Sequence, residues 1–172
     1  ALAYVDFYEE DFPWRYTPAR AAKPTEPADR RFKLRPWIAL LVLADDEFTN
    51  AVQRPNLPPS ITLVAEKANA ALPLQTETWA WAHAQISSLV ASPTAVDGAI
   101  RANPDNAIAR LISPRRLLTD RDYHAFLIPT FEAGRLAGLG EDVLAVPGQA
   151  PSWIAGGMPH SNVRPLEYPI YR

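Results

Sequence analysis

Acidic side chains gather at two places in the sequence, and carboxylates are the groups from which calcium sites and glycosidase active sites are built. The first group is Asp6, Glu9, Glu10 and Asp11, and the second is the Asp-Asp-Glu run at 45–47. Neither group is accompanied by the glycine-containing calcium loop or by a second carboxylate motif. We therefore interpret both as solvated or arginine-paired surfaces and not as sites of catalysis or metal binding.

The three histidines, His83, His124 and His160, are too far apart in the sequence to form a local metal motif. A histidine can also act as a general base, but only where partners orient it, and the sequence does not show which residues those would be. The Gly-x-Ser-x-Gly motif of a serine nucleophile does not occur either. We therefore predict no catalytic residue, no metal ligand and no cofactor, and the sequence assigns no enzymatic activity.

Two basic or glycine-rich features have the composition of anion sites. The segment 134–140, GRLAGLG, lacks the lysine and the serine or threonine of a P-loop and lies at the predicted end of a helix, so we interpret it as a glycine cap. Arg115 and Arg116 could clamp a carboxylate or phosphate through parallel hydrogen bonds. Pairing of these arginines with acids of the same chain is the simpler interpretation.

Aromatic side chains form the most prominent binding signal, because the chain has five tryptophans and six tyrosines. Trp14, Tyr16, Trp79 and Trp81, with His83 beside the last two, could anchor a protein interface or form a platform on which sugars stack. Core packing is the third interpretation, since small cores are also built from aromatic residues. These five residues and the two arginines are our candidate binding residues.

The helices and strands that position these side chains are interrupted by prolines. Because proline fixes φ and lacks an amide donor, the 18 prolines predict short helices. Strands are predicted at 3–8, 37–43, 61–64, 76–86, 110–113 and 123–129, and helices or helical turns at 45–54, 65–72, 93–101 (capped by Ser92), 105–110 and from 131 (capped by Thr130). Strands interleaved with short helices predict an α+β fold with a mixed or antiparallel sheet.

Two of the predicted strands have distinctive patterns. Residues 37–43, WIALLVL, form a continuous apolar run, which indicates a central strand buried on both faces. Over 76–86 the alternation places Trp79, Trp81, His83 and Gln85 on one face and smaller residues on the other.

Length and composition limit the class of protein. A chain of 172 residues with 48% hydrophobic residues can bury one core, so we predict a single α+β domain over 1–172, as a module of a longer protein. Residues 19–30 have little to bury and are predicted to form a mobile loop. A net charge of -2 argues against nucleic acid as a partner, and the absence of cysteine excludes disulfides and thiol chemistry.

The longest apolar run, at 37–44, is too short for a membrane span, and the first residues show no signal-peptide pattern. We therefore expect a cytoplasmic or particle-associated protein that does not use a membrane as a partner.

Four segments resemble parts of large, uncharacterised bacterial proteins from gene clusters for phage-tail-like or contractile injection particles. They are 6–18 (DFYEEDFPWRYTP), 34–43 (LRPWIALLVL), 79–83 (WAWAH) and 131–140 (FEAGRLAGLG). The resemblance carries no catalytic residues, and it implies the amino-terminal module of a longer protein that contacts other subunits. We therefore expect a structural or protein-interaction module. The alternative is a hydrolase, or a glycan-active or glycan-binding domain, that uses the acidic and aromatic residues.

Overall fold

The computed structural model describes residues 1–9, 11–18, 25, 34–87 and 92–171. The strands are β1 (Tyr4–Phe7), β2 (Ile38–Leu43), β3 (Phe48–Arg54), β4 (Leu57–Leu63), β5 (Ala82–Ile86), β6 (Ala107–Ile112), β7 (His124–Pro129) and β8 (Glu167–Pro169). The α-helices are α2 (Ala65–Ala71), α3 (Pro93–Ala102) and α4 (Glu132–Leu139), and the 3-10 helices are η1 (Phe12–Trp14), η2 (Gln75–Trp81), η3 (Pro104–Asn106) and η4 (Ala155–Gly157). Apart from Thr25, the predicted mobile loop at 19–30 lies outside the described residues.

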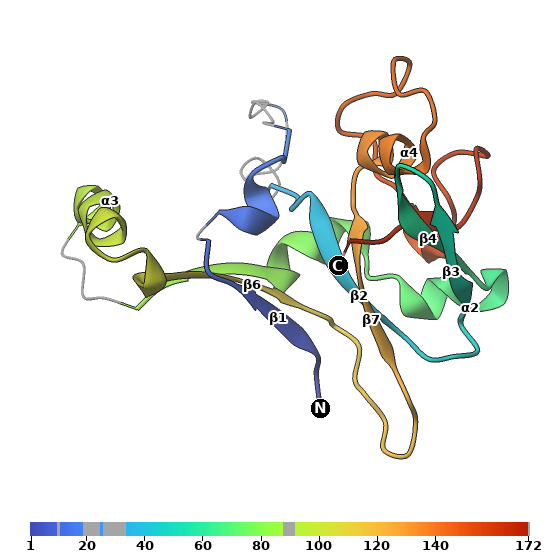
Figure 1. Cartoon of the computed structure of the whole chain (residues 1–172), viewed down its shortest axis with the longest axis horizontal. Coiled ribbons are helices and arrows are strands. Elements are labelled where there is room, and N and C mark those ends of the chain that lie inside the picture. The colour runs from blue at the N-terminus through green and yellow to red at the C-terminus, as the bar shows by residue number, and fades with distance from the viewer. Residues whose placement is uncertain (10, 19–24, 26–33, 88–91, 172) are drawn as a thin grey trace.

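Three antiparallel sheets lie along the molecule: β1-β6-β5, then β2-β7, then β3-β4-β8 (Figure 1). The helices α2 and α4 lie beside the last sheet, and α3 lies at the far end of the first (Figure 1). The predicted α+β fold is confirmed, and the pairing is antiparallel rather than mixed. None of the helices that the structure describes is long and apolar enough to cross a membrane.

Strand β2 is buried along its whole length between two apolar clusters, which confirms the prediction from its apolar run. Its odd-numbered side chains, with Leu41 in the middle, face a cluster that contains Trp153, Tyr168 and residues of β4 and α2. Its even-numbered side chains, with Leu40 in the middle, face the β1-β6-β5 sheet and the aromatic residues of η1. Among the described strands, β2 pairs only with β7. It therefore lies in the centre of the core, although it is not the central strand of a wide sheet.

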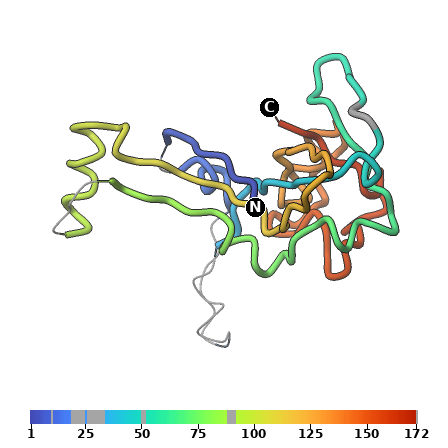
Figure 2. Tube along the Cα trace, turned by 90° about the horizontal axis from the view of Figure 1, so that it is seen from below, coloured from blue at the N-terminus to red at the C-terminus, as the bar shows by residue number. Residues whose placement is uncertain are grey.

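The β1-β6-β5 sheet, α3 and η3 form what we call the arm, which extends away from the rest of the molecule (Figures 1 and 2). Ser92 caps α3 as predicted, because the backbone N–H of Ala95 donates to its hydroxyl at 3.3 Å. Contacts of α3 are chiefly with η3, and none of its residues is buried. The aromatic segment at η1 is attached to the base of the arm, where the Trp37 indole donates to the Phe12 carbonyl at 2.7 Å.

The predicted helical turn after Leu43 is wrong, because residues 45–47 form a turn that leads directly into β3. The turn is closed by the backbone N–H of Ala44, which donates to the Glu47 carboxylate at 2.9 Å. The Phe48 ring then packs edge-on against Phe126, with centroids 5.1 Å apart. Here tertiary packing overrides the favourable effect of acids at a helix start.

The predicted strand at 76–86 is wrong in its first half, where η2 occupies 75–81 and β5 begins only at Ala82. Polar groups satisfy one another within the 3-10 turns: the Thr78 hydroxyl donates to the Gln75 carbonyl at 3.0 Å, and the Trp79 indole to the Thr76 carbonyl at 3.0 Å. Such local bonds compete with a strand ladder. Trp79 and Trp81 therefore do not share a strand face with His83.

Three smaller differences concern element ends. The predicted turn at 105–110 is shorter, because β6 begins at Ala107, which is fully buried. β4 begins at Leu57, before the predicted start at residue 61, and includes Pro58 and Pro59. Helix α4 begins without a side-chain cap, because the Thr130 hydroxyl donates to the Pro36 carbonyl instead. At its other end the predicted glycine cap is confirmed by Gly140, with φ of 80°.

Candidate functional site

The four aromatic candidates lie in different environments. Trp14 packs, half-buried, in the cluster between β2 and the arm, whereas Tyr16 is 65% exposed and lies edge-on to Trp37. Trp79 is exposed on η2, and Trp81 is half-buried at the end of the same helix. Among the described residues, no ring pair joins two of these four side chains. A stacking platform of neighbouring tryptophans is therefore not formed by this part of the chain.

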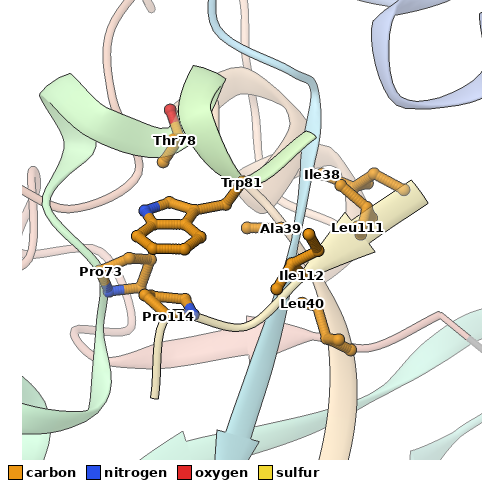
Figure 3. A pocket seen from close by; sticks show the side chains of 9 residues that line it. All are labelled: Ile38, Ala39, Leu40, Pro73, Thr78, Trp81, Leu111, Ile112 and Pro114. Carbon is orange, nitrogen blue, oxygen red and sulfur yellow. The ribbon is translucent and has the colours of Figure 1, made fainter. Parts of the chain in front are cut away.

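Trp81 lines a small apolar pocket between β2, the base of β6 and η2 (Figure 3). Its indole lies against Pro73 and Pro114, and Thr78 contributes the polar side chain of the lining (Figure 3). The free volume is ≈ 10 Å³, about that of one water-sized probe. Drug-sized ligands need roughly 300 Å³ or more. We therefore interpret the pocket as a small packing defect where the arm contacts β2, and not as a ligand site.

Arg115 is bound to Glu47 and is not available to clamp a ligand. Its Nη2 donates to Glu47 Oε1 at 2.7 Å, while its Nη1 donates to Oε2 and to the Val42 carbonyl. Hydrogen bonds from Arg115 hold the pKa of Glu47 below its ordinary value, although burial of the carboxylate acts in the opposite direction. Arg116 is exposed and has no ion-pair partner among the described residues, so the two arginines do not act as a pair.

The remaining charges of the 45–47 turn are also paired. Asp46 accepts hydrogen bonds from Lys67 and from Arg121, the latter at 2.5 Å. These bonds, first that from Lys67, lower the pKa of Asp46 to about 2. His124 Nε2 lies 2.6 Å from Asp45 Oδ1, with both side chains more than half exposed.

The Asp45–His124 contact joins an acid of the second acidic group to a histidine, an arrangement that a hydrolase could use. A carboxylate can orient a histidine as a general base, but catalysis also needs a reacting group and a site that binds the substrate. Neither residue lines the pocket in Figure 3. The pair therefore has one feature that a catalytic site needs, but it lies on an exposed surface.

The described members of the first acidic group, Asp6, Glu9 and Asp11, are paired with arginine, in agreement with our interpretation of the sequence. Asp6 accepts two hydrogen bonds from Arg110 across the β1–β6 pair, at 2.5 and 3.1 Å, and they lower its pKa. Arg15 bridges Glu9 and Asp11. Glu10 lies outside the described residues. No cluster of three or more possible metal ligands occurs in the part of the chain that the structure describes.

The other two histidines are separate from these charges. His83 lies on the exposed face of β5, where its Nε2 is 2.9 Å from the Ala80 carbonyl oxygen. As the strand pattern indicated, His83 and Gln85 share a face of β5, opposite to the face of the buried Ala82. His160 is exposed in the segment between η4 and β8.

Sequence reasoning missed the most deeply buried ion pair among the described residues, between Glu132 and Arg135 on α4. Ser161 also donates to Glu132, at 2.6 Å. Arg135 uses its remaining donors on the carbonyls of Val163, Arg164 and Glu167 and on the hydroxyl of Ser161. The spacing of Glu132 and Arg135, three apart in an otherwise apolar helix, is the signal that could have revealed the pair. Because its donors are used within the chain, the network is structural and not a ligand site.

Comparison of the chain with protein-family models, with curated proteins and with solved structures gave no match. What the chain can bind must therefore be inferred from its own surfaces. The pocket beside Trp81 is small and the described acids of both acidic groups have partners, whereas the arm presents the outer edge of β5 and a helix without a buried residue. The arm is the candidate functional region.

Proposed function

We propose that this chain is a structural, protein-interaction module whose arm contacts partner subunits. The observation that carries the proposal is α3, a ten-residue helix at the end of the arm with no buried residue (Figure 1). Val96, Ala99 and Ile100 lie on one face and are only half-buried, while Asp97 and Arg101 form an ion pair on another. Short helices owe most of their stability to packing of an amphipathic face, so α3 would gain stability from a partner.

The small pocket beside Trp81 adds no support for an enzymatic role. The pocket beside Trp81 has room for about one water, and an enclosed substrate site would need far more. Exposed amphipathic elements, by contrast, are the surfaces through which subunits associate. The exposed helix α3 of the arm therefore favours a role in association with other subunits.

The resemblance of four segments to proteins from phage-tail-like gene clusters supports a finer proposal. We infer that the partner subunits belong to such an assembly, and that the chain acts there as one module of a longer protein. This inference rests on the resemblance alone, whereas the role of the arm rests on its geometry.

The Asp45–His124 contact favours hydrolysis as a second candidate function. If the pair acts as an oriented general base, His124→Ala abolishes cleavage of a chromogenic ester or glycoside, whereas His160→Ala does not. Absence of turnover by the unmodified chain on both substrate types argues against this candidate. Because the pair is exposed, the proposal of an interaction module remains the first.

Site-specific photo-cross-linking tests the role of the arm. A photoreactive phenylalanine derivative replaces Thr94, an exposed residue of α3, and in a control chain it replaces the exposed Leu144, which follows α4. Both chains are irradiated in lysate of the source organism, and cross-linked proteins are identified by mass spectrometry. We expect defined structural subunits at Thr94 and not at Leu144. Identical products at both positions, or none at Thr94, would contradict the proposal.

A further inference from the structure

The outer strands of the two three-stranded sheets differ in how their edges are protected. An unpaired edge is a template for another strand, and proteins protect edges with charges, prolines and bulges. β1 carries Asp6 in its ion pair, β3 ends at Arg54 and shifts register twice against β4, and β8 is short and ends at Pro169. β5, with the sequence AHAQI, contains no acid, lysine, arginine, proline or glycine. Its edge is therefore the unprotected one of these four.

The hydrogen-bond pattern shows which groups of β5 point outward. The backbone N–H of Ser87 donates to the Asn106 carbonyl at 2.7 Å, next to the β5–β6 pair and in the same register. Because bonded and non-bonded pairs alternate in an antiparallel ladder, Gln85 bonds to β6, whereas the N–H and C=O of Ala84 and Ile86 point away from it. These outward groups have no hydrogen-bond partner among the described residues.

Exposure limits the part of this edge that another chain can reach. Ala82 is buried, but residues 83–85 and Ser87 are exposed and Ile86 is half-buried. The accessible edge is therefore 83–87, with Gln85 at its centre. Figure 2 shows β5 as an outer border of the arm, with β6 and β1 on its other side.

We propose that β5 pairs antiparallel with β5 of a second copy of this chain, about a two-fold axis at Gln85. The inference rests on the proposed function and specifies one partner of the arm. In this register Ala84 lies opposite Ile86 of the second copy, and each such pair exchanges both of its backbone hydrogen bonds. The outward groups of both residues are then satisfied, and the two arms form one continuous sheet.

The side chains of this edge are complementary to themselves, which favours a second copy over an unrelated strand. Gln85 lies opposite Gln85 of the second copy, and a carboxamide both donates and accepts, so the two can bond across the axis. His83 lies opposite Ser87 of the second copy, and the exposed edge places no pair of like-charged acids or lysines face to face. Two-fold symmetric pairing is also the commonest form of self-association.

Sedimentation velocity at chain concentrations from about 1 μM to about 1 mM tests the proposal. Ala84→Pro removes an outward N–H without removing a bond to β6, and proline is tolerated at such edge positions. Gln85→Glu places two carboxylates opposite each other. The control is Gln53→Glu, the same change on an exposed residue of β3. We expect the unmodified chain and the control to dimerise, and both β5 variants to raise the dissociation constant about tenfold or more.

A mixing experiment tests the register. Gln85→Glu and Gln85→Lys chains each self-associate weakly, but an equal mixture is expected to form a heterodimer, because the opposed charges attract only if residue 85 faces itself. Far-ultraviolet circular dichroism tests whether each variant is folded. If Ala84→Pro is not folded, the two Gln85 variants alone test the proposal. A chain that stays monomeric throughout, or a dimer that these variants leave unchanged, would overturn the proposal.

The sedimentation and mixing experiments can fail or succeed independently of the cross-linking experiment. A monomeric chain that cross-links to other subunits through Thr94 removes the self-pairing and leaves the interaction module. A dimer through β5 without cross-links to another subunit keeps this inference and removes the wider role of the arm.

Discussion

Arg135 Nη2 and Glu132 Oε1 lie 2.7 Å apart on α4, in an ion pair whose two side chains are each only 1% exposed. The same guanidinium donates at 3.0 Å to the carbonyls of Val163, Arg164 and Glu167. One turn of α4 therefore binds the irregular segment that leads into β8. Because β8 supplies Tyr168 to the core, the ion pair connects a local helix to the global fold.

Replacing Arg135 tests how far the fold depends on this network. Arg135→Ala leaves the Glu132 carboxylate buried without its cation, and breaking a buried pair in this way typically costs about 3–5 kcal/mol. We expect a fall of that size in the free energy of unfolding, measured by urea denaturation. Arg101→Ala, which breaks the exposed pair on α3, is the control and should change little. Equal effects of the two substitutions would show that the buried network is not a major contributor.

The Glu47–Arg115 pair predicts a dependence of stability on acid. Its hydrogen bonds lower the pKa of Glu47 in the folded chain from the ordinary value of 4.5, so the folded state binds this proton less readily than the unfolded state. Glu47 therefore contributes stability above pH 4.5 and loses that contribution as the pH falls through its lowered pKa.

Glu47→Gln should lower the unfolding free energy near neutral pH and make its decline in acid less steep. Urea denaturation at a series of pH values below neutrality measures both effects. The exposed Glu66 of α2 offers a matched control, since Glu66→Gln should leave the shape of the profile unchanged. A Glu47→Gln profile parallel to that of the unmodified chain would contradict the expectation.

Two glycine-to-alanine changes are expected to act in opposite directions. Gly157 has φ of +68°, and a Cβ there would lie 2.5 Å from the backbone nitrogen of Asn69 in α2. The left-handed backbone alone costs about 1–3 kcal/mol for a residue with a side chain, and the clash adds to it, so Gly157→Ala should lower the free energy of unfolding.

Gly98 lies within α3 with nothing near its Cβ position, so Gly98→Ala should stabilise the helix by about 0.5–1 kcal/mol. Thermal melts monitored by circular dichroism separate a lowered from a raised midpoint, and a fall with both variants would refute the assignment for Gly98.

Tyr168 predicts sensitivity to alkali. Burial raises the pKa of its hydroxyl above the ordinary value of 10.0, because the core disfavours the ionised form. Its contribution is present below pH 10 and is lost as the pH rises above it, when the unfolded state can ionise and the folded state cannot. Tyr168→Phe should reduce this alkaline loss. Tyr16→Phe, at an exposed ring, should not, and unfolding followed at increasing pH by circular dichroism compares the two.

Several elements could be predicted because their causes lie within short windows of sequence. The apolar run of β2 required burial on both faces, and Ser92 with Pro93 started α3. The strand predicted at 76–86 failed for the converse reason. Its alternating tryptophans mimicked a strand period, while Thr78 and Trp79 found carbonyl partners three residues earlier in the chain.

The candidate site was predictable in type but not in arrangement. Acids that are solvated or paired with arginines were expected, but Asp6 and Arg110 are 104 positions apart, and Glu47 and Arg115 are 68 apart. The sequence could not show that the guanidinium of Arg115 would donate its hydrogen bonds to Glu47 and so be unavailable to a ligand. Nor could it show that Arg135, within a segment interpreted as a glycine cap, would lie in the core.

By itself, then, the sequence determined the class of fold, the buried strand β2, the proline start of α3 and the glycine end of α4, and it limited the acids to solvated or arginine-paired positions. These follow from backbone restriction, hydrophobic periodicity and charge balance, which act locally or through composition. Only the tertiary structure decided which charges are desolvated, where the tryptophans lie, and that β5 is an outer strand with outward backbone groups. Those properties depend on contacts between residues distant in sequence, because burial and strand pairing are set by whichever surfaces the folded chain brings together.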